Sequence, residues 1–218
     1  MGKDISTNTY SNRKGIPEVI KGKIANWTFG PGQRLTEIYL INVLSTTRNK
    51  IREALRQLEQ EGFVKIIPNV GAKVIEFSQK DIENIYDILG ALEGLAVRII
   101  TPFLRAEQLE SLRILINKME ATNRISLFHK YNMKFHSLII ELSENERLIK
   151  LAENLRFSIR CASFQSMSSP GQMEASIKEH RRIFGAIKDR KSVKAEQLVR
   201  NHILHAKNRL MKYMNKSL

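Results

Sequence analysis

The chain has 218 residues, of which 42% are hydrophobic, and it carries a formal net charge of +14 from 36 Lys and Arg against 22 Asp and Glu. This length and apolar content are enough for one large or two small folded domains, and they exclude a disordered chain. The positive charge favours a polyanionic partner, either nucleic acid or an acidic membrane surface, so local patterns must decide between the two.

Neither a membrane span nor a signal peptide is expected. The longest apolar run, residues 85–101, is interrupted by Asp87, Glu93 and Arg98, whereas a spanning helix needs about 20 apolar residues in succession. The first residues, MGKDISTNTYSNRKG, lack the apolar stretch of a signal peptide. The single cysteine, Cys161, cannot form an internal disulfide, so we expect a protein of the reducing cytoplasm with no membrane partner.

Residues 10–77 are expected to form a first domain that begins with three helices. The segment IPEVIKGKIANW has apolar residues at helical spacing and ends at the turn FGPGQ. Thr36 is a suitable N-cap for a short second helix, which ends at the STT turn. A third helix is predicted from Thr47, whose hydroxyl is expected to cap it, to Gly62, a residue type that commonly ends helices.

A β-hairpin follows the third helix. FVKII and VIEF read as two strands that are joined by the turn PNVGAK. This turn carries Asn69, Gly71 and Lys73, residues that suit close approach to a DNA phosphate backbone. Three helices and a hairpin together predict a winged helix-turn-helix domain.

Residues 78–218 show the helical period and no convincing strand. Ser78 and Asp81 fit a helix start, and the helix that follows is unusually apolar. Five further helices are predicted, at 106–122, 125–143, 145–166, 174–190 and 192–214. The second domain is therefore expected to be an all-α helical bundle, and the whole chain to be mainly α.

The start of the third predicted helix is rich in polar and basic residues, namely Thr47, Arg48, Asn49, Lys50 and Arg52. In helix-turn-helix proteins this part of the second helix of the motif enters the DNA major groove, where Arg donates two hydrogen bonds to guanine. A charged helix taken alone is more often a solvated face stabilised by i,i+4 pairs. The preceding short helix, the tight turn and the following hairpin favour DNA recognition here.

The segment QRLTEIYLINVLSTTRNKIREALRQLEQEGFVKIIPNVGAKV resembles the winged-helix signature of GntR-type bacterial transcription regulators. The pieces DIENIYDILGALEGLA, NMKFHSLIIELSENERL and EHRRIFGAIKDRKSVKAEQLVRNHI resemble the all-α, ligand-binding FCD domain of the FadR-like subgroup, in its six-helix, VanR-like version. The resemblance implies that Arg48 and Arg52 contact DNA. Asn49, Lys50 and Ile38 depart from the family pattern, and Ile38 stands where many relatives carry a DNA-contacting Arg.

Several histidines fall on predicted helices of the second domain. Asn132 and His136 are one helical turn apart and project from one face, and neutral imidazole is the commonest ligand of zinc and similar ions. A single histidine on a helix is more often a structural residue than a metal ligand. The spacing of these histidines alone does not favour metal binding over that structural role. The resemblance implies a divalent metal, zinc or nickel, held by Asn132, His136, His180 and His202, with His205 as the substitute for His202. Asn132 replaces the family's Asp, so the metal charge would stay uncompensated and favour a carboxylate effector.

A second departure from the family concerns the effector. Relatives commonly carry R-x-x-L-E in the first long helix of this domain, with the Arg near the ligand, but this chain has Leu89 in the segment LGALE. Arg156 and Arg160, one helical turn apart, are candidates for an anion contact. Surface exposure is the alternative for each of them.

These patterns predict an effector-responsive transcriptional regulator, in the simplest case a repressor, that binds an inverted-repeat operator on double-stranded DNA as a homodimer and is thereby held at the nucleoid. The expected effector is a small organic acid. A nonspecific architectural DNA-binding protein, which needs no buried ligand site, is one alternative. A metal-dependent hydrolase is another, but the sequence has no HExxH or nucleophile motif and no evident general base, so we expect no enzyme.

Overall fold

The computed structural model describes residues 15–25, 28–68, 70–166 and 171–216, without the side chains of residues 25, 157–166 and 216. The chain divides into two compact units, residues 1–77 and 78–218. Within the described residues, every helix is too short or too polar to cross a membrane.

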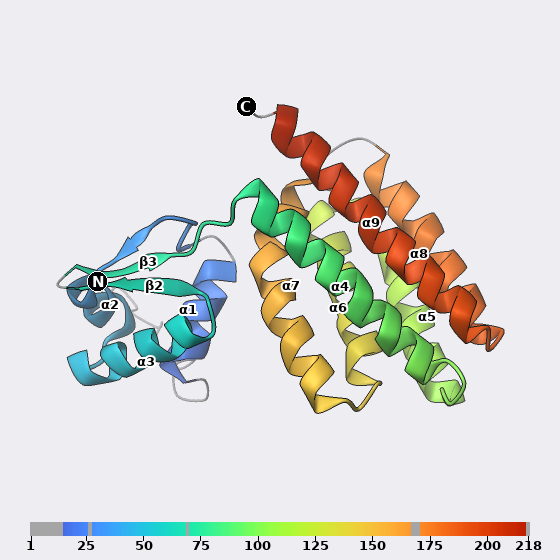
Figure 1. Ribbon diagram of the computed structural model, residues 1–218, viewed down its shortest axis with the longest axis horizontal. Helices are drawn as coiled ribbons and strands as arrows, with labels where there is room; N and C mark the ends of the chain where they lie inside the picture. The colour runs from blue at the N-terminus through green and yellow to red at the C-terminus, as the bar shows by residue number, and fades with distance from the viewer. Residues whose placement is uncertain (1–14, 26–27, 69, 167–170, 217–218) are drawn as a thin grey trace, which may run out of the picture. The chain divides into compact units, whose positions relative to one another are not determined.

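The N-terminal unit contains three helices and a small antiparallel sheet (Figure 1). The strand order is β1-β3-β2, and β2 and β3 form a hairpin where one was predicted. The prediction of VIEF as its second strand is wrong, because β3 begins inside the predicted turn PNVGAK and only Val74 of VIEF belongs to it. The turn is shorter than predicted, since the N–H of Val70 already donates to the oxygen of Ile67 at 3.0 Å. Strand β1 was not predicted, because two residues carry no periodicity, yet Leu35 of β1 pairs with Ala72 of β3. The bounds of the elements are α1 Ile16–Ala25, β1 Arg34–Leu35, α2 Glu37–Leu44, α3 Arg48–Gln60, β2 Val64–Ile67 and β3 Gly71–Val74.

The two helices of the helix-turn-helix begin in different ways. Thr36 caps α2 as predicted, because its hydroxyl accepts a hydrogen bond from the backbone N–H of Tyr39 at 3.2 Å. The prediction that the Thr47 hydroxyl caps α3 is wrong, since its side chain makes no cap hydrogen bond. Only the Thr47 carbonyl takes part, accepting from the N–H of Ile51 at 3.1 Å. Among the described residues no side chain caps the start of α3, so its first N–H groups can face a phosphate.

Helix α3 is strongly two-sided. Ile51, Ala54, Leu55 and Leu58 are buried against the rest of the unit, as their helical spacing requires. Arg48, Asn49, Lys50, Arg52 and Arg56 are exposed. The buried side therefore fixes the helix in its domain and presents the basic side to a partner.

Gly71 begins β3 at a point where only glycine fits. Its φ is +115°, and a Cβ there would lie 2.6 Å from the backbone oxygen of Leu35. The sequence suggested that Gly71 allows the backbone to approach DNA closely. In the structure, the close approach at Gly71 is to strand β1 of the same sheet.

We expect Gly71→Ala to lower the free energy of unfolding of the N-terminal unit by about 3 kcal/mol, combining about 1–2 kcal/mol of backbone strain with about 1–3 of overpacking. Gly62→Ala is the matched control, because Gly62 also has a positive φ, +77°, but no described atom lies within 4 Å of the added Cβ. It should lose only the backbone share, about 1–2 kcal/mol. Urea unfolding followed by the fluorescence of Trp27, the single tryptophan of the chain, measures both. Equal losses would contradict the contact with Leu35.

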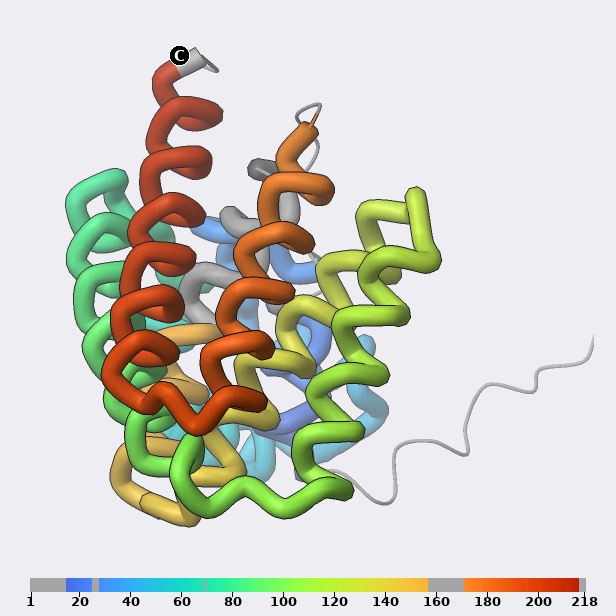
Figure 2. Tube along the Cα trace, turned by 90° about the vertical axis from the view of Figure 1, so that its right-hand side faces the viewer, coloured from blue at the N-terminus to red at the C-terminus, as the bar shows by residue number. Residues whose placement is uncertain are grey.

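The described residues of the C-terminal unit form six helices and contain no strand. Helices α4 and α9 pack along each other in opposite directions, and α8 packs beside α9 (Figures 1 and 2). Ser78 and Asp81 form the predicted capping box at the start of α4. The helix bounds are α4 Gln79–Ile100, α5 Ala106–Glu120, α6 Ile125–Glu141, α7 Glu146–Ser166, α8 Gln172–Lys188 and α9 Ser192–Lys216.

Candidate metal centre and nucleic-acid interface

Three histidines from three helices meet inside the C-terminal unit. His136 of α6, His180 of α8 and His202 of α9 are all buried. The Nε2 atom of His136 lies 3.3 Å from Nε2 of His180 and 3.2 Å from Nε2 of His202. A ligand atom from each residue therefore falls within 4.8 Å of the others, a spacing that one metal ion can bridge.

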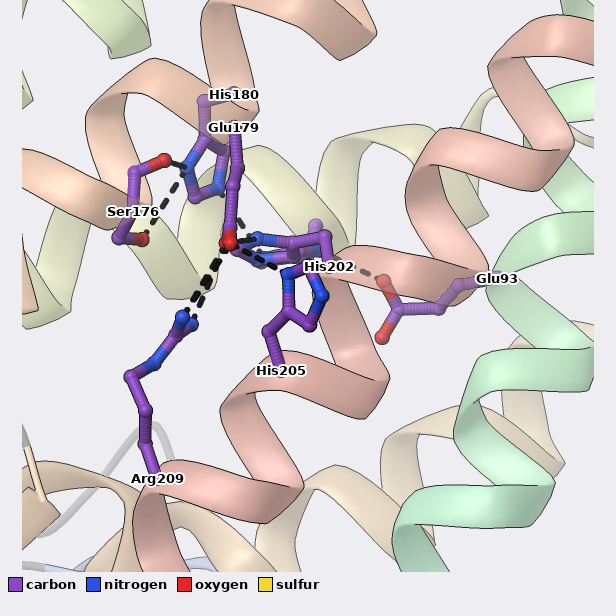
Figure 3. Close-up of polar contacts among 8 residues, drawn as sticks. Glu93, Ser176, Glu179, His180, His202, His205 and Arg209 are labelled. Atoms are coloured by element: carbon purple, nitrogen blue, oxygen red, sulfur yellow. Dashed lines mark hydrogen bonds and ion pairs between the residues drawn. The ribbon is translucent and has the colours of Figure 1, made fainter.

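The opposite ring nitrogen of each histidine is held by an oxygen acceptor. Nδ1 of His136 is 2.7 Å from the Glu93 carboxylate. Nδ1 of His202 is 2.6 Å from the Glu179 carboxylate (Figure 3). Nδ1 of His180 is 2.7 Å from the backbone oxygen of Ser176. An ionised carboxylate and a carbonyl only accept hydrogen bonds, so each Nδ1 carries the proton. Partners of this kind orient the imidazoles that bind metals.

The Nε2 atoms of the three rings consequently face one another. Burial, followed by the charges of Arg156 and His202, lowers the pKa of His136 well below its ordinary value. Burial is also the largest cause of the lowered pKa of His180. These two rings are therefore neutral, and lone pairs that face one another at this distance repel unless a cation lies between them.

Asn132 adds an oxygen to the same face of α6. It precedes His136 by one helical turn and is buried. Its Oδ1 atom has no hydrogen-bond partner among the described residues. A buried amide oxygen without a donor is unfavourable, and a bound cation would satisfy it. Three imidazole nitrogens, joined by this oxygen, would make a donor set that suits zinc or nickel.

Glu93 of α4 lies behind His136 and was not recognised as a site residue from the sequence. It is fully buried, and its second carboxylate oxygen pairs with Nη2 of Arg156. Burial raises the pKa of Glu93, and the guanidinium of Arg156 opposes this shift. Both of its oxygens are thus occupied, so Glu93 orients His136 and is not placed as a general base.

Glu179 links His202 to the outer part of α9. Its carboxylate accepts from Nδ1 of His202 and of His205, the latter at 2.7 Å, and lies 3.4 Å from Nη1 of Arg209 (Figure 3). Burial would raise the pKa of Glu179, but the hydrogen bond and charge of His202, together with Arg209 and His205, lower it to about 2. His205 is 55% exposed and its Nδ1 faces Glu179, so it lies outside the cluster of His136, His180 and His202.

Of the two arginines proposed as effector contacts, the structure describes the side chain of Arg156 but not that of Arg160. Arg156 is not a surface residue, because only 8% of its side chain is exposed and it pairs with Glu93. Its Nε–H is buried and has no acceptor among the described residues. Leu89, at the position where relatives carry the effector arginine, is buried in α4. The Arg160 side chain lies outside the described residues.

On the N-terminal unit, one carboxylate holds the two arginines at the start of α3. Glu37 of α2 lies 2.7 Å from Nε of Arg52 and 3.5 Å from Nε of Arg48. Both guanidinium side chains nevertheless stay more than half exposed. Glu37 was missed because its partners are 11 and 15 residues further along the chain.

A hollow of about 520 Å³ opens between α2, α3 and the β2–β3 hairpin, which is the wing of the winged helix-turn-helix. Four arginines line it, of which Arg34 on β1 and Arg56 on α3 join Arg48 and Arg52. Ile38 and Gly71 also line it. The sequence did not indicate Arg34, because strand β1 was not predicted.

The other DNA-contact candidates are spread over the start of α3 and the wing. Thr47, Asn49 and Lys50 are exposed next to Arg48. Lys73 is exposed on β3 and pairs with Glu76 at 3.0 Å. Asn69 lies outside the described residues.

Comparison with known families finds two matches that together span most of the chain. A family described as "Bacterial regulatory proteins, gntR family" matches residues 12–74, and a family described as "FCD domain" matches residues 84–205.

Curated relatives cover the chain at nearly full length. The "Uncharacterized HTH-type transcriptional regulator YdhC" of Bacillus subtilis (strain 168) is 32% identical over 193 residues, which are 85% of this chain and 85% of that protein. The "Nta operon transcriptional regulator" of Aminobacter aminovorans is 29% identical over 82% of this chain and 84% of its own length.

Solved structures share the fold. Escherichia coli McbR/YncC has a TM-score of 0.79 at 19% identity, covering 91% of this chain and 96% of its own. The putative transcriptional regulator GntR from Rhodococcus sp. RHA1 has a TM-score of 0.76 at 20% identity, covering 90% of this chain and 96% of its own.

Proposed function

Because the chain belongs to the GntR family of bacterial transcriptional regulators and carries an FCD domain, we propose that it is a repressor whose operator affinity depends on what the buried centre of its C-terminal unit binds. Members of this family are DNA-binding regulators and not enzymes, so the hydrolase alternative is excluded. The observation that carries the proposal is that the chain has both an exposed arginine cluster on α3 and, in its other unit, a buried cluster of three histidines. Its place of action is the bacterial nucleoid, in the cytoplasm.

Operator reading is assigned to the exposed start of α3. Arg48 and Arg52 are held by Glu37 in the free protein, which limits the conformations that they lose on binding. Asn49 and Lys50 lie beside them and give this chain its own base preference. Lys73 on the hairpin and the other two arginines that line the hollow, Arg34 and Arg56, contact phosphates and fix the register.

A homodimer and an inverted-repeat operator complete the DNA side of the proposal. Helix α4 exposes an apolar row at helical spacing, formed by Ile88, Leu95 and Ile99 and continued by Phe103, which is 82% exposed. A row of this kind favours burial against a second copy of the same helix. Two recognition helices about 34–36 Å apart would then read two half-sites.

The metal is assigned to His136, His180, His202 and Asn132, whose arrangement fits zinc or nickel. A bound divalent ion supplies positive charge and open coordination positions to a ligand. The nearby carboxylates do not neutralise it, because Glu93 pairs with Arg156 and Glu179 with Arg209. We therefore assign a small organic acid as the effector, with the unpaired Nε–H of Arg156 as a further donor.

Effector binding would act on DNA affinity through the population of two arrangements of the dimer. An effector that prefers one arrangement by about 1–3 kcal/mol changes operator affinity about 5–150-fold. If the protein were a nonspecific architectural DNA-binding protein, its DNA affinity would not depend on an effector. That alternative predicts DNA binding with a strong salt dependence and little sequence preference.

Substitution of single basic residues distinguishes side chains that contact bases from side chains that contact phosphates. Arg48→Ala is expected to relax the preference at one base pair of each half-site, because a contact worth about 1–3 kcal/mol is lost. Lys73→Ala, the matched control, should weaken all duplexes alike and reduce the slope of log K against log salt by about one. Selection from a randomised duplex library, followed by titration at several salt concentrations, measures both. An unchanged selected sequence for Arg48→Ala would remove Arg48 from base reading.

A further inference from the structure

Ile38 is an exposed apolar residue on a surface otherwise lined by arginines. It is the second residue of α2, and 64% of it is exposed. Single exposed apolar residues are common and need no special explanation. The position of Ile38 is what distinguishes it, because it lines the same hollow as Arg48 and Arg52.

Two contacts fix Ile38 beside the start of the recognition helix. Thr36 caps α2 and so sets where its first turn begins. The next residue, Glu37, lies 2.7 Å from Arg52 and 3.5 Å from Arg48. Any DNA that reaches these arginines in its major groove therefore also comes close to Ile38.

The chemistry of the major groove leaves one kind of partner for an isoleucine. Base edges there present hydrogen-bond donors and acceptors, and the only apolar group is the C5-methyl of thymine. Ile38 cannot satisfy a donor or an acceptor, so a guanine or cytosine edge packed against it would lose hydrogen bonds with water. A β-branched side chain in a helix also has one strongly preferred rotamer, which gives the contact a fixed shape.

From this juxtaposition we infer that Ile38 is a specificity-determining residue that contacts the C5-methyl group of a thymine in each operator half-site. The inference rests on the proposed operator binding and adds a base that this chain selects.

The test replaces the thymine methyl and the isoleucine separately. The probe is the duplex recovered by selection with the wild-type protein, in which each thymine is replaced in turn by deoxyuridine. That change removes only the methyl group and leaves base pairing intact. At one thymine of each half-site, wild-type binding should weaken about fourfold, the factor that corresponds to one buried methylene-sized group.

The variant Ile38→Ala should bind the unmodified duplex about fourfold more weakly per half-site and be insensitive to deoxyuridine at that same thymine. Val43→Ala is the matched control, because Val43 is an exposed apolar residue of the same helix that is not among those lining the hollow. It should keep the wild-type sensitivity. Both substitutions are at exposed positions, and thermal unfolding checks that the variants are folded.

Other results would overturn the inference. Wild-type affinity that is unchanged by every deoxyuridine substitution would exclude a methyl contact. Sensitivity that persists in Ile38→Ala would assign the methyl to another side chain. A selection that recovers no preferred duplex at all would overturn the proposed operator binding itself, and this inference with it, whereas a recovered operator without the methyl effect overturns the Ile38 contact alone.

Discussion

His136→Ala is expected to abolish stoichiometric binding of zinc by this protein. The Nε2 atom of His136 is 3.2–3.3 Å from Nε2 of both His202 and His180, so its loss removes the central nitrogen of the cluster. Loss of a residue that only orients a ligand typically lowers metal affinity about 10–100-fold, and loss of a ligand should exceed this. Zinc titration with a competing chromogenic chelator, and metal analysis of the purified protein, measure the effect.

His205→Ala is the matched control for this substitution. It removes a histidine that is 55% exposed and contacts Glu179 but not the other ring nitrogens of the cluster. Zinc stoichiometry should stay at one ion per chain with this variant. Wild-type zinc binding by His136→Ala, or equal losses in the two variants, would contradict the metal assignment.

Glu93→Leu should lower the free energy of unfolding of the metal-free protein by about 3–5 kcal/mol. The carboxylate is fully buried between Arg156 and His136, so its removal leaves a buried guanidinium without a counter-charge. The double variant Glu93→Leu/Arg156→Met removes both charges and should regain much of that loss. Urea unfolding followed by circular dichroism in the presence of a chelator measures the two values.

An exposed ion pair provides the comparison. Glu120 pairs with Arg181 at the surface, where solvent screens the interaction, so Glu120→Leu should change the free energy of unfolding by less than about 1 kcal/mol. A loss for Glu93→Leu no larger than that for Glu120→Leu would show that the buried pair does not hold the site together. Failure of the double variant to recover would mean that His136 orientation, and not the unpaired charge, accounts for the loss.

Periodicity and turn residues were sufficient to predict most of the N-terminal unit. The apolar spacing of α3 and the turn before β3 predicted the helix-turn-helix and the wing, because these signals lie within a few residues of one another. Strand β1 was missed because its pairing with β3 is a contact between distant segments. The hydroxyl of Thr47 does not cap α3, although the residue type favours it, which shows that an N-cap preference does not determine the rotamer.

In the C-terminal unit, the family resemblance indicated the histidines, but their supporting residues could not be found in the same way. Glu93 precedes His136 by 43 residues and Arg156 by 63 residues, yet it contacts both. Which side chains lie behind a ligand depends on how α4, α6 and α7 pack, and no local pattern carries this information. The same reason accounts for Arg156, which looked like a surface residue and is buried by the helices around it.

The central claim is that the DNA-binding unit responds to what the buried centre of the C-terminal unit holds. The most direct measurement is the Kd for the selected operator duplex, taken for metal-free protein, for zinc-loaded protein, and for zinc-loaded protein with acetate, succinate or citrate. We expect at least one of these conditions to change the Kd about 5–150-fold, and His136→Ala to remove the change. A Kd that is the same under every condition in the wild-type protein would contradict the account.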